Sequence, residues 1–220
     1  MKNKVVSLDK AMQSIGNGAT LMVGGFLSAG TPVGIIDAIL QKGVKDLTLI
    51  ANDTGTPGKG ISKLIAAKAV KRLIVSHIGT NPETGRQMMA GELDVQLVPQ
   101  GTLAEQIRAA GVGLGGVLTP TGVGTDVAGG KQILTINGRQ YLLELPLRAD
   151  VAILRGSVVD TFGNIIYHKT TQNFNPIMAM AAKTVIVEAE RIVDVGEIDP
   201  NYVMTQGIFV DYIVGGNNNG

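Results

Sequence analysis

The sequence predicts an α/β fold, a single three-layer domain in which a mainly parallel, mixed sheet carries helices on both faces. Short apolar runs alternate with helical patterns along the chain, which is typical of βαβ units. Glycine accounts for 30 of the 220 residues, about twice ordinary usage, and favours many tight turns. Hydrophobic residues make up 45% and charged residues 17%, so the chain is too apolar to be disordered. Its length favours one domain over two.

In the first half we expect strands at 20–26, 46–51, 72–77 and 94–99, and helices at 31–40, 61–69, 82–90 and 101–110. The first helix is well delimited, because Thr31 and Pro32 are typical of a helix start and Gly43 is typical of a residue just past a helix end. Its predicted buried face consists of Val33, Ile36 and Leu40.

The second half begins with a glycine-rich segment, 112–130, which indicates an irregular functional loop. Asn137 and Gly138 then separate two apolar runs, 133–136 and 139–144, and predict a hairpin with a type I′ turn that makes the sheet mixed. Strands are expected at 151–155, 164–167 and 184–188, with a helix at 175–182. We expect the domain to cover 1–214, and 215–220 to form a flexible tail without an apolar anchor.

Charge and composition exclude several classes of partner. The formal net charge is +1 without a basic stripe, so neither nucleic acid nor a membrane surface is expected as a partner. No 18-residue apolar run or secretory signal occurs. The chain has no Cys, which excludes disulfides and cysteine metal sites and fits a cytoplasmic protein; we expect no metal. Small molecules or proteins are the expected partners.

The segment 17–32 places glycines between a strand end and a helix start. Open α/β sheets bind ligands at this position, although a tight turn needs the same residues. Gly24, Gly25 and Gly30 do not match the G-x-G-x-x-G fingerprint of dinucleotide sites, and we expect the second strand to close with Asn52 and no suitably placed acid. The run 58–60 lacks the other features of a phosphate-binding P-loop. Neither nicotinamide nor nucleotide chemistry is therefore indicated.

The same segment has a longer pattern: Asn17-Gly18, three apolar residues at 21–23, Gly-Gly-Phe, then Gly30 and Pro32. This pattern resembles the first signature of the family I coenzyme A transferases. The likeness continues through 49–54, 76–85, 98–105, 118–125 and 147–150, and so covers most of the chain. The resemblance implies the α/β fold of that family.

The resemblance also implies a function. Members of the family move coenzyme A between an acyl-CoA, such as acetyl-CoA or acetoacetyl-CoA, and a short-chain carboxylate by a covalent ping-pong route. Their nucleophile is a glutamate in a Ser-Glu-Asn-Gly motif of the β subunit, and this sequence has no such motif. The chain is therefore expected to be an α subunit, active with a β subunit in an α2β2 assembly. Coenzyme A is then a substrate, and no permanently bound cofactor is expected.

Carried over to this sequence, the family's coenzyme A-binding loop is expected at Gly24, Gly25, Phe26, Leu27, Ser28, Ala29 and Gly30. Gln100 and Asn52 match two amides that support the reaction, and an amide can donate to a developing oxyanion without adding charge. From the residues alone, Gln100 would instead be assigned to a helix start.

The remaining candidates are weaker. His77 and His168 are the only histidines, and Glu83 and Glu92 lie near His77 in sequence, but a single histidine at a strand end is more often structural. Glu105 is expected to pair with Arg108 at i,i+3 spacing. Methionines 88, 89, 178 and 180 are expected to fill the core.

Two alternatives stay open at this point. One is a sugar-phosphate isomerase or deaminase of related fold, which requires a complete acid and base within this chain. The other is a non-catalytic acyl-CoA-binding module, which requires only the glycine loop. The preferred acid is not readable from the sequence, because one or two side chains that shape a pocket decide it.

Overall fold

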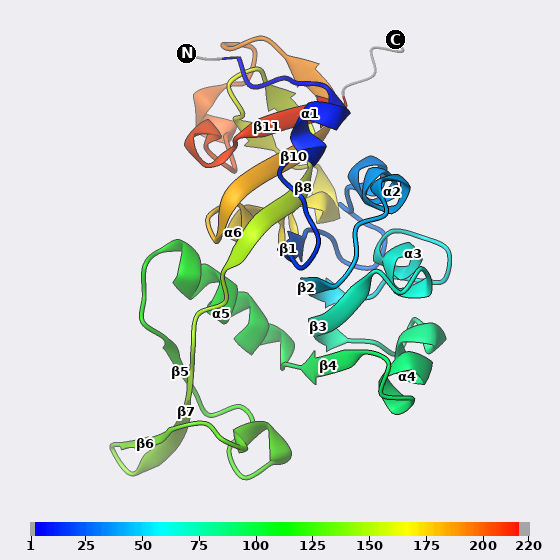
Figure 1. The fold of residues 1–220 in the computed structure, drawn as a ribbon. Helices are drawn as coiled ribbons and strands as arrows, with labels where there is room; N and C mark the ends of the chain where they lie inside the picture. Colours follow the sequence, from blue (N-terminus) through cyan, green and yellow to red (C-terminus); the bar gives the residue numbers. More distant parts are fainter. Residues whose placement is uncertain (1–2, 216–220) are drawn as a thin grey trace.

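The computed structural model describes residues 3–215, and within them most strands lie in one long sheet (Figure 1). Its order is β11-β10-β8-β1-β2-β3-β4, and every neighbouring pair on this path is parallel. The strands are β1 (Thr20–Val23), β2 (Leu47–Asp53), β3 (Val70–His77), β4 (Asp94–Leu97), β8 (Ala149–Asp160), β10 (Ala182–Val193) and β11 (Tyr212–Gly215). Short β9 (Ile165–Ile166) pairs antiparallel with β8.

Helices cover both faces of this sheet, as predicted. One face carries α1 (Leu8–Met12), α2 (Val33–Lys42), α3 (Ile61–Ala66) and α4 (Pro82–Met89), and the other carries α5 (Gln100–Gly111) and α6 (Asn175–Ala179). Side chains alternate across a strand, so Leu21 and Val23 join the core under α2 and α3, whereas Met22 joins the core under α5 and α6. The three-layer α/β class is confirmed.

Helix α2 follows the glycine-rich segment and ends where expected. Gly43 takes a left-handed conformation, with φ of 71°, and closes the helix. The predicted buried face was right for Ile36, which is fully buried, and partly for Leu40, which packs against the core, but wrong for Val33, which is 38% exposed. Ile35 and Ile39 complete the buried face. Val33 lies in the first turn, before the helix comes down onto the sheet, so its side chain faces outward.

Three further strands form a separate antiparallel sheet, which we call the arm (residues 117–144). They are β5 (Val117–Thr119), β6 (Ile133–Ile136) and β7 (Arg139–Glu144), in the order β5-β7-β6. Asn137 and Gly138 have φ of 50° and 76°, as a type I′ turn requires. The hairpin is confirmed, but it does not enter the main sheet. Figure 1 shows it projecting away from the main sheet, below α5, and within residues 3–215 the strand that makes the main sheet mixed is β9.

Other expectations need correction. The segment 112–130 contains β5 and a short 3-10 helix, Asp126–Ala128, so it is only partly irregular. Met88 and Met89 are exposed, the latter by 88%, since α4 turns their side of the helix to solvent. Gly215 ends β11 beside Ala189, and 216–220 of the predicted tail lie outside the described residues. Three more 3-10 helices are present: Lys169–Gln172, Pro200–Tyr202 and Gly207–Phe209.

Candidate active site

Two side-chain amides meet at the carboxyl edge of the sheet. Asn52 lies near the end of β2 and Gln100 is the first residue of α5, and Gln100 Nε2 donates to Asn52 Oδ1 at 2.7 Å. Ser76 Oγ lies 3.0 Å from the same Oδ1. Asn52 is 1% exposed. The side chain of Gln100 thus points across to the neighbouring strand end and does not cap its own helix.

Asp53, the last residue of β2, lies beside this pair and was not foreseen. Its carboxylate accepts hydrogen bonds from Asn52 Nδ2 at 2.8 Å, from Leu27 N at 2.7 Å and from Gly55 N at 2.7 Å. The expectation that no acid stands at the end of the second strand was therefore wrong. The strand continues to Asp53, and this carboxylate is turned toward the glycine loop.

A cavity of about 420 Å³ opens over the amide pair. Its volume is in the range of sites for small molecules. Lysine and arginine side chains do not line it, and its lining residues are Phe26, Leu27, Asn52, Asp53, Ser76, His77, Thr80 and Gln100. His77 is thus an exposed wall of the cavity, which its position at a strand end did not indicate.

The glycine loop, residues 24–30, forms the rim of this cavity. Phe26 and Ala29 exchange backbone hydrogen bonds of 2.9 and 3.0 Å, which makes a tight turn with Leu27 and Ser28 at its tip. Leu27 has φ of 55°, a strained conformation for a branched side chain. A second opening of about 730 Å³ lies on the outer side of the same tip, where it also meets Lys59. The loop tip, Leu27 and Ser28, therefore lies between two cavities.

The glycines of this loop are required by the protein's own side chains. A Cβ at Gly24 would lie 1.8 Å from Asn175 Oδ1, and one at Gly25 would lie 2.3 Å from Thr31 Oγ1. Neighbouring side chains of the protein therefore occupy the space that the missing side chains of these glycines leave. A substitution such as Gly25→Val would distort the loop before it touched a ligand.

Most backbone N–H groups of the loop are also used internally. Gly25 N donates to Asn173 Oδ1 at 3.2 Å, and the amides of 24, 26, 27 and 29 have partners as well. Within residues 3–215, the amides of Ser28, Gly30 and Thr31 have no hydrogen-bond partner. Thr31 is buried, so the amides of Ser28 and Gly30 are the ones through which the loop can contact a ligand.

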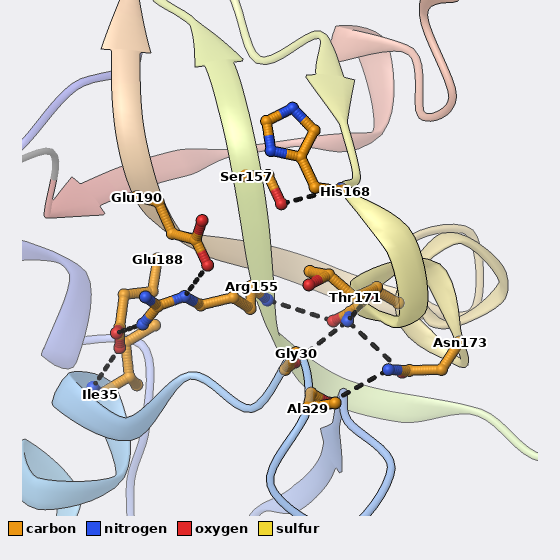
Figure 2. Close-up of polar contacts among 11 residues, drawn as sticks. Ala29, Gly30, Ile35, Arg155, Ser157, His168, Thr171, Asn173, Glu188 and Glu190 are labelled. Atoms are coloured by element: carbon orange, nitrogen blue, oxygen red, sulfur yellow. Dashed lines mark hydrogen bonds and ion pairs between the residues drawn. The ribbon is translucent and has the colours of Figure 1, made fainter.

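Two asparagines hold the loop from the side of α6. Asn173 Nδ2 donates to Ala29 O at 3.1 Å, and Figure 2 shows its side chain reaching toward the loop. Asn175 is fully buried; its Nδ2 donates to Gly30 O at 3.0 Å and its Oδ1 accepts from Arg155 N at 3.1 Å. The pattern of the loop gave no signal for these partners, which lie about 145 residues away in sequence.

The start of α2 is held from the sheet as well. Glu188 Oε2 accepts from Ile35 N at 2.9 Å, and Arg155 forms an ion pair with Glu188 at 2.5 Å (Figure 2). A carboxylate near a helix N-terminus is favourable, because free N–H groups and the helix dipole meet there. The end of the loop is thus held by Asn173 and Asn175, and the helix that follows it is held by Glu188.

The weaker candidates from the sequence, Glu83, Glu92 and His168, do not join the amide pair. Glu83 and Glu92 pair with Arg86 at 2.8 and 3.0 Å and not with His77, so this chain assembles no acid and base at that place. The hydrogen bond from Arg86 lowers the pKa of Glu83 to about 2. His168 is exposed, and its backbone N donates to Ser157 Oγ at 2.9 Å.

One further sequence prediction can be checked directly. Glu105 pairs with Arg108 at 2.7 Å, as predicted from their spacing. No helix within residues 3–215 is both long and apolar enough to cross a membrane. In the same residues, no three His, Asp or Glu side chains gather as metal ligands would.

Comparison with known proteins identifies the class. The family described as "Coenzyme A transferase" matches residues 5–216. In fold, the chain is similar to glutaconate coenzyme A-transferase from Acidaminococcus fermentans, with a TM-score of 0.83, 22% identity, and coverage of 96% of this chain and 75% of that one. It is also similar to the acyl-CoA transferase YdiF of Escherichia coli O157:H7, with a TM-score of 0.85 and 20% identity. All of this chain is matched there, and it spans 48% of the YdiF chain.

The chain therefore belongs to the coenzyme A transferase family, and the resemblance noted in its sequence is confirmed. Along 97% of its length it is 53% identical to "Acetate CoA-transferase subunit alpha" of Escherichia coli K12, of which it covers 97%. It is 52% identical to the "Acetoacetyl-CoA:acetate/butyrate CoA transferase alpha subunit" of Clostridium acetobutylicum, with coverage of 97% and 98%. It corresponds in sequence to the chains named alpha.

Proposed function

We propose that this chain is the α subunit of a heteromeric transferase that moves coenzyme A between acetyl-CoA or acetoacetyl-CoA and a short-chain carboxylate. The relatives of about 50% identity, named for acetate and acetoacetyl-CoA, support this choice of substrates. The observation that carries the proposal is the amide pair: Gln100 and Asn52 meet at 2.7 Å on a small cavity whose one lining carboxylate, Asp53, is already hydrogen-bonded.

The chemistry assigned to the pair is stabilisation of negative charge. When a carboxylate attacks a thioester, charge develops on the carbonyl oxygen, and a fixed N–H donor stabilises it most in a site shielded from water. Gln100 Nε2 uses one hydrogen toward Asn52 and has a second available. The carboxylate lining the cavity, Asp53, already accepts three hydrogen bonds and is poorly placed to attack.

The attacking glutamate is accordingly assigned to a β subunit, in an assembly of the α2β2 type within the cytoplasm. The exposed tip of the glycine loop is assigned to coenzyme A, through its free amides at Ser28 and Gly30. The cavity volume of about 420 Å³ favours acids of a few carbon atoms over long acyl chains. Coenzyme A and the carboxylate are then substrates shared by the two subunits.

The test is kinetic and uses the enzyme assembled with its partner chain. Gln100→Ala should lower turnover roughly 10²-fold, because it removes a donor used in the transition state. Gln100→Glu should be worse, since it adds negative charge next to a carboxylate. Gln140→Ala, at an exposed position on β7, serves as the matched control and should leave turnover unchanged. Equal and small effects of both Gln100 variants would contradict the assignment.

A trapping experiment tests the division of labour between subunits. Acyl-CoA added without an acceptor should leave a glutamyl-CoA thioester, which hydroxylamine or borohydride captures. Peptide mapping should find the modification on the partner chain and not on Glu83, Glu92, Glu105 or Glu144 of this one. Steady turnover by the purified single chain, or a modified glutamate on it, would contradict the proposal. Binding of acyl-CoA without exchange in the assembled protein would favour a non-catalytic module.

A further inference from the structure

We infer that Asp53 is the positioning residue of this site: its carboxylate fixes the orientation of the Asn52 amide, and hence of Gln100, and ties that pair to the tip of the glycine loop. The inference rests on the proposed function of Gln100 and goes one step further. It assigns a role to the residue that bonds to both parts of the site.

The orientation of the Asn52 amide is set by what each end of it faces. Its Nδ2 lies 2.8 Å from Asp53 Oδ2, and its Oδ1 faces Gln100 Nε2 at 2.7 Å. A carboxylate only accepts hydrogen bonds, so it must face the NH2 end of the amide. The carbonyl end must then face Gln100, which leaves Gln100 to donate. Asp53 therefore decides that Gln100 presents N–H groups at the cavity.

The same carboxylate oxygen holds the loop tip. Leu27 N donates to Asp53 Oδ2 at 2.7 Å, and this contact joins residues 26 positions apart. Leu27 has φ of 55°, a strained conformation for such a residue that persists only where its surroundings impose it. The hydrogen bond to Asp53 is the contact that holds Leu27 N in place. Loop tip and amide pair are thus fixed by a single atom.

A purely local role for Asp53 does not account for this arrangement. Its Oδ1 does make a local turn, accepting from Gly55 N at 2.7 Å. Asp160 shows what a local role looks like: it is equally buried, and its carboxylate accepts from Phe162 N, Gly163 N and Asn164 N, all within one turn. Asp53 differs because its other oxygen reaches out of its turn, to the site.

The negative charge of the Asp53 carboxylate contributes to its positioning role. Asp53 is 4% exposed, and within residues 3–215 it forms no ion pair, so its charge is balanced by hydrogen bonds alone. An amide in its place keeps the shape but turns an NH2 group toward at least one donor. With its NH2 group in place of Oδ2 it faces Leu27 N and Asn52 Nδ2, so Asn52 must rotate its own amide and aim its NH2 group at Gln100 Nε2. With its NH2 group in place of Oδ1 it faces Gly55 N, and a neutral oxygen then holds Leu27 N and Asn52 Nδ2 more weakly than the carboxylate does.

The experiment compares two isosteric substitutions in the assembled enzyme. Asp53→Asn should lower kcat roughly 10-fold to 100-fold with a smaller change in KM, because the Gln100 donor acts in the transition state. Asp160→Asn is the matched control: it removes the charge of a buried carboxylate that is bonded within its own turn, and should lower thermal stability without lowering kcat. A fall in kcat of equal size in both variants would overturn the inference.

A double-mutant cycle separates positioning from a general structural effect. If Asp53 acts through Gln100, then Asp53→Asn should slow the Gln100→Ala enzyme several-fold less than it slows the unmodified enzyme. Equal slowing in both backgrounds would overturn the inference while leaving the proposed function intact. Full activity of Gln100→Ala itself would instead contradict the proposed function. Asp53→Asn with unchanged kcat, beside an impaired Gln100→Ala, would overturn the role of Asp53 alone.

Discussion

On the side of β2 the glycine loop is held by a carboxylate, Asp53, whereas on the side of α6 it is held by two neutral amides, Asn173 and Asn175. The amides bond to loop carbonyls and to a loop N–H, so they fix its shape without adding charge. The carboxylate contacts the loop at its tip only and shares that contact with Asn52. The shape of the loop is thus set from the side of α6, whereas its alignment with the amides of Asn52 and Gln100 is set from the side of β2.

The largest effect on stability is expected at Asn175. Asn175 is fully buried, and Asn175→Ala leaves Gly30 O, Thr171 O and Arg155 N, which lie in half-buried residues, without their side-chain partner. Each such buried group costs about 1 to 3 kcal/mol, so the free energy of unfolding should fall by about 3 kcal/mol or more. Urea unfolding measures it, with exposed Asn201→Ala as a control expected within about 0.5 kcal/mol. A fall below 1 kcal/mol would mean that the α6 side does not hold the loop.

A smaller loss is expected when the same contact is crowded from the loop side. In Gly24→Ala the new methyl group would meet Asn175 Oδ1 at 1.8 Å, so the side chain or the loop must shift. Overpacking of this kind typically costs about 1 to 3 kcal/mol. Gly16→Ala is the control, since its Cβ meets nothing within 4 Å, and thermal unfolding of the two variants should differ clearly. Equal melting temperatures would contradict the close fit of loop and Asn175.

Asn173 should contribute less to the free energy of unfolding than Asn175, although both residues hold the loop from the side of α6. Its amide bonds to Gly25 N and Ala29 O, but the residue is only half-buried, so water can replace part of what Asn173→Ala removes. We expect a loss of about 1 kcal/mol in the free energy of unfolding by urea titration. A loss as large as that of Asn175→Ala would show that burial does not separate the two residues.

The smallest effect on stability is expected at the exposed ion pairs of Arg86 with Glu83 and Glu92, which lie away from the glycine loop. The Arg86 hydrogen bond lowers the pKa of Glu83 from 4.5 to about 2, so the charged carboxylate is favoured in the folded chain. Its stabilisation is complete above pH 4.5 and is lost as the pH falls toward 2. Glu83→Gln should therefore be slightly less stable than the unmodified chain at pH 7 and nearly equal to it near pH 2. Melting curves across this range measure it, and a gap that widened in acid would contradict the pairing.

The strands and helices of the main sheet were largely predictable, because their periodicity is local. Alternation across β1 places Met22 opposite Leu21 and Val23, and the glycine after α2 marks its end. Placement of the hairpin was not predictable in this way. The signal at Asn137 defines a turn and says nothing about which sheet its strands join, and they form an arm of their own.

The candidate site was predictable only where a family pattern covered it. Gln100 and Asn52 were identified through the resemblance, and the structure brings them into contact. Asp53, Asn173 and Asn175 were missed, because each acts through a contact with a loop that is distant in sequence. Spacing arguments reach a few residues along a helix or strand, whereas these contacts depend on how the strand order folds the chain back on itself.

The first and last segments of the described chain pair with each other at the β11 edge of the main sheet. Val5 forms a parallel bridge with Ile213 of β11, Val6 N donates to Ile213 O and Ile213 N donates to Lys4 O, each at 2.9 Å. The first and last segments are therefore neighbours that run in the same direction, so a linker from residue 215 to residue 3 would run back along this edge of the sheet. Opening the chain between Asn137 and Gly138 would then cut no strand. Such a circular permutant should keep the main sheet intact.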